Sequence, residues 1–202
     1  MKVINAGYSI YNGESYLSMV SRVEEIARTC YKSEDKITEE SGEKMIRGLI
    51  KSGHEAMIEH ASVSVKFIVD RGVSHEIVRH RLAAYAQEST RYCNYSKGKF
   101  GGEITVIRPC FFEEGSDEYY EWLDAMDAAE DSYLDLLELT GAPEQARDVL
   151  PTSVKTEINV TMNMREWRHF FKLRALDKTG KAHPQIKEVA IPLLAEFKER
   201  YP

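Results

Sequence analysis

The stretch Ala61-Ser62-Val63-Ser64-Val65-Lys66-Phe67-Ile68-Val69 alternates between two kinds of side chain. Valine or phenylalanine stands at every odd position from 63 to 69, and serine or lysine stands at positions 62, 64 and 66. A period of two predicts a strand with one buried face. The segment Val154–Met162 repeats the pattern, so we expect two half-exposed strands.

Segments with helical periodicity surround these strands. Helices are expected at Tyr16–Tyr31, Ser41–Ser52, Val73–Leu82, Ser116–Thr140, from Pro143, at Asn163–Arg174, and from Pro184 to near Tyr201. Further strands are expected at Val3–Ile10 and Glu103–Ile107, and a loop at Ala86–Gly102. This mixture predicts an α+β fold, a central antiparallel or mixed sheet with flanking helices. Without linkers or repeats, residues 1–202 are expected to form a single domain.

Composition limits the functional classes. The chain has 202 residues, 43% hydrophobic and 30% charged, with a formal net charge of -6. The acidic balance argues against nucleic-acid binding, and no stretch approaches the roughly 20 apolar residues of a membrane span. No signal peptide is recognisable, and Cys30, Cys93 and Cys110 are too widely spaced for a disulfide framework. We therefore expect a cytoplasmic protein with reduced thiols.

The most unusual local feature is the cationic segment Arg79–Arg91. It begins Arg79-His80-Arg81, and adjacent helical positions point about 100° apart. Positive charge spread in this way suits a large anionic ligand. Ser89 and Arg91 add a hydroxyl and a guanidinium fork, which are common phosphate ligands. A basic surface turn would account for the charges equally well.

Polar residues also mark the last strand-to-helix junction. Asn163, Arg165, His169 and Arg174 interrupt an otherwise apolar helix. Asn163 is suited to capping the helix, and an arginine placed like Arg174 usually extends to the surface.

Other catalytic patterns are missing from the sequence. The histidine spacings do not fit a helical metal motif, so no metal site is expected. Cys110 follows a proline but lacks a neighbouring histidine, so we expect a buried structural cysteine rather than a nucleophile. Without a glycine-rich phosphate loop, a nucleotide or flavin would have to be held by side chains and helix ends.

Together these segments resemble the flavin-dependent thymidylate synthases. Arg79-His80-Arg81 followed, after seven residues, by Ser89 is similar to the R-H-R-x7-S motif of that family. The flanks also match, at Gly53-His54-Glu55, Glu59-His60, Ser89-Thr90-Arg91-Tyr92, Asn163-x-Arg165 and Leu173-Arg174-Ala175. The resemblance covers roughly Ile4 to Ala195.

The resemblance implies FAD-dependent methylation of dUMP to dTMP in a homotetramer with sites shared between subunits. Methylenetetrahydrofolate would be the carbon donor and NADPH the reductant, with tetrahydrofolate released. It implies Arg174 as the catalytic residue. The implied dUMP ligands are Glu76, Arg79, Gln87, Glu88, Ser89, Thr90, Arg91, Arg147 and Arg174. The implied FAD ligands are His54, Ala56, Arg79, His80, Arg81, Gln87, Asn163, Arg165 and His169.

The sequence departs from some relatives at implied contacts. Glu76 stands in place of a glutamine, so an ionised side chain there can accept hydrogen bonds but not donate them. Ala56 stands in place of a small polar residue of some relatives, and His169 stands in place of an asparagine. Two other classes stay open at this stage: a nucleotide-binding regulator without catalysis, and an RNA-binding module that uses Arg79–Arg81 with Tyr85 and Tyr92.

Overall fold

The computed structural model describes residues 1–202, apart from the side chain of Lys99. Its α-helices are α1 (Tyr16–Thr29), α2 (Ser41–Lys51), α3 (Arg71–Ile77), α4 (Asp117–Thr140), α5 (Pro143–Ala146), α6 (Met164–Arg174) and α7 (Pro184–Arg200). Its 3-10 helices are η1 (Glu34–Lys36), η2 (Glu55–His60), η3 (Gly98–Phe100) and η4 (Arg147–Val149). Its strands are β1 (Lys2–Ile4), β2 (Gly7–Ile10), β3 (Ser62–Asp70), β4 (Ala83–Gln87), β5 (Thr105–Ile107) and β6 (Lys155–Asn163).

The main sheet has the strand order β2-β3-β6-β4, and every neighbouring pair is antiparallel. The two strands identified by alternation, β3 and β6, are its central pair. They are paired over their full lengths, from Ser62 opposite Asn163 to Asp70 opposite Lys155. A separate parallel pair joins β1 to β5. The expected α+β class with an antiparallel or mixed sheet is therefore confirmed.

One hydrophobic core covers the inner face of β3 and β6. Val65, Phe67 and Val69 are fully buried there, as alternation predicts. The largest buried side chain of α6, Trp167, packs against Phe67 and donates its indole hydrogen to the Val63 carbonyl at 3.0 Å. This bond satisfies the buried indole N–H and ties α6 to the sheet.

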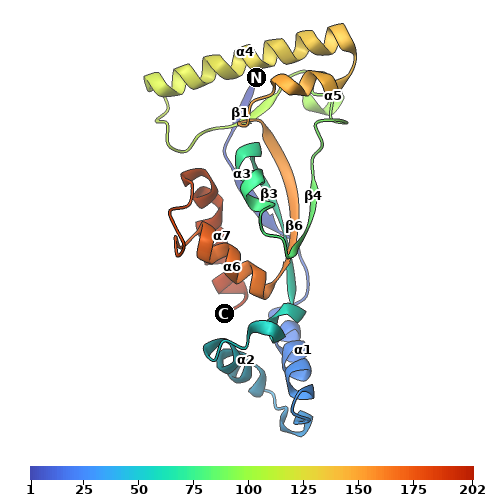
Figure 1. Ribbon diagram of the computed structural model, residues 1–202, viewed down its shortest axis with the longest axis vertical. Helices are drawn as coiled ribbons and strands as arrows, with labels where there is room; N and C mark the ends of the chain where they lie inside the picture. The colour runs from blue at the N-terminus through green and yellow to red at the C-terminus, as the bar shows by residue number, and fades with distance from the viewer.

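A second core lies beneath α4. Tyr133 of α4 is fully buried in it with Ile104 and Val106. Figure 1 shows the result as an elongated molecule, with α4 and α5 at one end of the longest axis and α1 and α2 at the other. The sheet connects the two ends. None of the described helices combines the length and apolar composition needed to cross a bilayer.

Three predictions of secondary structure were wrong in detail, and Cys110, which was expected to be buried, is exposed. The helix expected at Val73–Leu82 already ends at Ile77, and residues 83–87 form β4, which overlaps the expected loop Ala86–Gly102. The β4 sequence lacks β-branched residues, so this strand depends on pairing with β6 rather than on intrinsic propensity. The expected strand Val3–Ile10 is divided between β1 and β2, which belong to different sheets.

Replacing Phe67 by alanine should strongly destabilise the fold. The ring is fully buried and contacts both Trp167 and Phe170, so we expect a loss of about 3–5 kcal/mol in the free energy of unfolding. Ser62→Ala, at an exposed position of the same strand, should change it by no more than about 0.5 kcal/mol. Urea unfolding measures both, and equal losses would contradict the assigned faces of β3.

Candidate functional site

The guanidinium of Arg174 joins a cluster of polar side chains at the end of α6. Its Nη1 donates to Glu76 Oε2 at 2.6 Å, and its Nη2 donates to the Glu76 carbonyl at 3.1 Å. Its Nε donates to His80 Nε2 at 3.3 Å. The side chain is only 19% exposed, so this arginine is held against α3 instead of extending into solvent.

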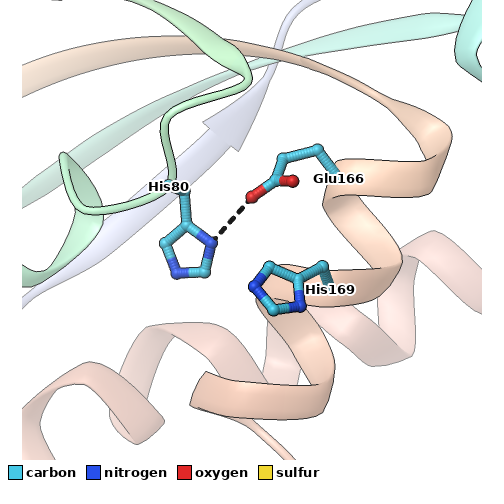
Figure 2. Close-up of side chains that lie close together, drawn as sticks. All are labelled: His80, Glu166 and His169. Atoms are coloured by element: carbon cyan, nitrogen blue, oxygen red, sulfur yellow. Dashed lines mark hydrogen bonds and ion pairs between the residues drawn. The ribbon is translucent and has the colours of Figure 1, made fainter.

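His80 links Arg174 to Glu166 through the two nitrogens of one imidazole. Figure 2 shows the bond from His80 Nδ1 to Glu166 Oε1, which is 3.0 Å long. Because the arginine Nε can only donate, Nε2 must accept, and Nδ1 then carries the ring proton. Burial lowers the pKa of His80 below its usual 6.5, and the Arg174 charge lowers it further, whereas the hydrogen bond to Glu166 opposes both. At neutral pH the ring is therefore uncharged.

The same region contains three potential metal ligands. Ligand atoms of His80, Glu166 and His169 lie within 4.8 Å of one another. Spacing along the chain could not reveal this set, because the fold brings position 80 to the helix that bears the other two. However, a cation on His80 Nδ1 would replace the proton donated to Glu166, and it would lie near the charge of Arg174. These contacts favour hydrogen bonding over metal binding.

The end of β4 lies beside an open cleft of about 850 Å³. Gln87 and Glu88 line it, as do Lys155, Glu157 and Asn159 of β6. Glu88 accepts a hydrogen bond from Tyr95 at 3.1 Å and pairs with Lys155 at 2.8 Å. Burial alone would lower the pKa of Lys155, but its bonds with Glu88 and Glu157 raise it overall. The lysine is therefore a stable cation in this cleft.

Gln87 is directed into the protein. Its amide donates to the hydroxyls of Ser74 at 3.0 Å and Thr156 at 3.2 Å. Both hydrogens of this amide are thus used within the chain, and only its oxygen is left for a ligand.

The loop after β4 presents the expected phosphate ligands. The Ser89 hydroxyl accepts a hydrogen bond from the Arg91 backbone N–H at 3.3 Å. The Ser89 carbonyl accepts from the backbone N–H groups of residues 92 and 93. Arg91 is exposed and lies over the Tyr92 ring, 5.4 Å from its centre. Thr90 is buried, with 6% exposure, which favours a structural role for its side chain.

The start of α6 brings together several residues that the resemblance assigns to flavin. Asn163 caps the helix by accepting from the Glu166 backbone at 2.9 Å. Arg165 is exposed and pairs with Glu59 of η2. The implied contacts His54 and Ala56 are also exposed, at the start of η2. His169 is exposed on the same helix, with its ring 5.5 Å from that of His80.

Other implied site residues stay apart from this region. Arg147, on η4, is exposed and directly follows α5, so it lies at the opposite end of the molecule from α2 and η2 (Figure 1). The nine residues of β6 between these regions extend over roughly 30 Å. One chain therefore does not bring all the implied residues to one active site.

Sequence reasoning did not identify two residues of the candidate site, Glu166 and Lys155. Glu166 follows Asn163 by three residues, as in a capping box, but only the Asn163 half forms, because the Glu166 carboxylate turns to His80. In the alternating segment Val154–Met162, Lys155 occupies one of the outward positions. That alternation was the available signal, since it placed Lys155, Glu157 and Asn159 on one face.

Comparison with known proteins identifies the family. The model of the family described as thymidylate synthase complementing protein matches residues 15–202. The chain belongs to this family. A member from Pyrococcus furiosus, named flavin-dependent thymidylate synthase, is 34% identical over 167 residues. That alignment covers 82% of this chain and 66% of the relative, so the chain spans about two thirds of the relative's length.

Other family members align over more of their length. A flavin-dependent thymidylate synthase from Corynebacterium aurimucosum is 32% identical, with 89% of this chain and 76% of the relative covered. Among solved structures, the UMP/dUMP methylase PolB from Streptomyces cacaoi, bound with 5-Br dUMP, aligns with a TM-score of 0.79. It covers 99% of this chain and 93% of that one at 24% identity, and this likeness supports the shared fold.

Acidification should destabilise this family member through His80. The folded pKa lies below 6.5, so below that pH the unfolded chain binds more protons and the free energy of unfolding falls. His80→Gln keeps one donor and one acceptor but does not titrate, so its stability should fall less between pH 7 and pH 5. Denaturant unfolding at both pH values measures the difference. An unchanged pH dependence in the variant would contradict the assigned burial of a neutral ring.

Proposed function

We propose that this protein catalyses the FAD-dependent reductive methylation of dUMP to dTMP. Methylenetetrahydrofolate supplies the carbon, NADPH the reducing equivalents, and tetrahydrofolate is released. The observation that carries the proposal is Arg174, a mostly buried guanidinium at the position for which the resemblance implies a catalytic role. The names of the relatives support the reaction class.

The chemistry of dUMP fits the cationic residues. Its phosphate suits the exposed Arg91 with Ser89, and Arg147 of another subunit supplies a second guanidinium. Methylation at C5 develops negative charge on N3 and the adjacent carbonyls of uracil. A guanidinium such as that of Arg174 stabilises this charge most effectively where water is largely excluded.

The residues present also fit a flavin dinucleotide. Arg79 and Arg81 are exposed on either side of the buried His80. Among the side chains that the structure describes, neither has an ion-pair partner, so both are available to a pyrophosphate. Asn163, Arg165, His54, Ala56 and His169 would form the remaining surface. When bound and reduced by NADPH, the flavin would supply the hydride that completes the methyl group.

The distribution of these residues favours a shared active site. Arg147, an implied dUMP ligand, and η2, which carries implied FAD ligands, lie at opposite ends of the molecule (Figure 1). One active site can contain both only if they come from different subunits. A cytoplasmic homotetramer with sites built at subunit contacts meets this requirement.

Arg174→Ala should abolish most dTMP formation while flavin stays bound. Without the guanidinium, charge on the uracil is unstabilised, and we expect a loss on the order of 10²–10³ in rate. Absorption spectra measure bound flavin, and product analysis at saturating dUMP measures turnover. Arg200→Ala removes an exposed arginine of α7 that pairs with Glu196 and should retain wild-type turnover. Near wild-type methylation by Arg174→Ala would overturn the assignment of this residue, and a wild-type protein without flavin or dTMP formation would overturn the function.

Mixed subunits should regain activity that each parent lacks. Arg91→Ala and Arg174→Ala chains, assembled together, form some sites in which both residues are intact, provided that different chains supply them. Co-expression with two affinity tags isolates the mixed oligomer for assay. An active monomer in sedimentation experiments would contradict the shared site.

A further inference from the structure

We propose that Glu166 and His80 are positioning residues that hold the guanidinium of Arg174 in place against Glu76. This inference rests on the proposed function of Arg174. It adds Glu166, which the family motif does not include, and assigns the His80 side chain a role inside the protein.

The contacts form one continuous series. Glu166 Oε1 lies 3.0 Å from His80 Nδ1, His80 Nε2 lies 3.3 Å from Arg174 Nε, and Arg174 Nη1 lies 2.6 Å from Glu76 Oε2. Every hydrogen bond in the series has a defined direction, because the guanidinium only donates and the ionised carboxylates only accept. The series therefore fixes the Nδ1–H tautomer of His80.

Packing keeps the imidazole in this orientation. His80 is 3% exposed, and its ring lies against Phe170 at 5.1 Å. Its own carbonyl accepts from the Tyr85 hydroxyl, which also donates to the Ile77 carbonyl at 3.0 Å. The side chain and the backbone of His80 are thus both held, and the ring has little freedom to release Arg174.

Glu166 determines which ring nitrogen carries the proton. It is 7% exposed and approaches from the first turn of α6, on the side of His80 away from Arg174. Without its carboxylate, the proton can move to Nε2, where it would oppose the Arg174 Nε–H. The guanidinium would then lose one of its three bonds and rotate more freely. A misplaced charge stabilises a reacting group less well, while substrate binding is largely kept.

The first test determines the tautomer of His80 in the absence of substrate. In ¹H–¹⁵N correlation spectra of the ligand-free protein, His80 should carry its proton on Nδ1. Hydrogen exchange at Arg174 Nε should be at least tenfold faster in Glu166→Met, which removes the acceptor at similar volume, than in wild type. A proton on Nε2 in wild type, or unchanged exchange in the variant, would overturn the proposal. This result does not depend on dTMP formation, so it separates failure of this inference from failure of the proposed function.

The second test is a kinetic double-mutant cycle. Glu166→Met should lower kcat for dTMP formation by about ten- to a hundredfold, because a small misplacement of a group that acts on the substrate has effects of this order, with KM for dUMP changed less than threefold. Glu166→Gln keeps an acceptor oxygen and should recover part of the loss. In an Arg174→Lys background, Glu166→Met should change kcat less than twofold, because the guanidinium that it positions is gone.

Glu24 supplies a matched control. It is also buried and pairs with an arginine of its own helix, Arg28, but it lies outside the series. Any effect of Glu24→Met should be the same in both backgrounds, as expected for a general loss of stability. If Glu166→Met behaves in the same way, Glu166 only supports the fold and the proposed positioning role is wrong.

Discussion

The pairing of β3 with β6 positions the elements that surround it. Nine residue pairs in unbroken register place one apolar face of each strand inward, and a shift by one residue would turn every side chain to the other face. The same register brings the start of α6 beside the end of η2, through the bond from the Met164 backbone to the Ala61 carbonyl at 2.8 Å. The elements that carry the candidate site are thus attached to the two ends of one strand pair.

Because the site elements are attached to opposite ends of the strand pair, the candidate residues fall into separate groups. β6 begins with Lys155, in the cleft beside Glu88, and ends with Asn163, which caps α6. The groups suited to phosphate and those suited to the flavin surface are therefore separated by the length of a strand. The cluster around Arg174 lies between α3 and α6. These helices follow opposite ends of the antiparallel strand pair, and the last residue of α6 reaches Glu76 of α3. The paired strands thus set the distance between these groups within the chain.

Sequence reasoning succeeded where local pattern determines structure. Alternation identified β3 and β6, and Asn163 was correctly assigned as a helix cap. It failed where contacts between distant parts of the chain determine the structure. The residues Ala83–Gln87 have little strand propensity and become a strand only beside β6. Glu166 resembles an ordinary capping residue, and its contact with His80 joins positions 86 residues apart. No spacing rule along one chain reports such a contact, nor which ring nitrogen of His80 bears the proton.

The early end of α3 determines the directions in which the side chains of the three adjacent basic residues Arg79, His80 and Arg81 point. Had the helix continued, consecutive side chains would have turned steadily around one axis. Instead the chain leaves the helix at Ile77, and the Tyr85 phenol, whose pKa burial raises to about 12, stays protonated and binds the carbonyls of Ile77 and His80. The backbone can then direct Arg79 and Arg81 to solvent and His80 to the interior. Arg79-His80-Arg81 is therefore not one patch of surface charge. Its two arginine side chains are open to ligands, whereas its histidine side chain packs inside the protein.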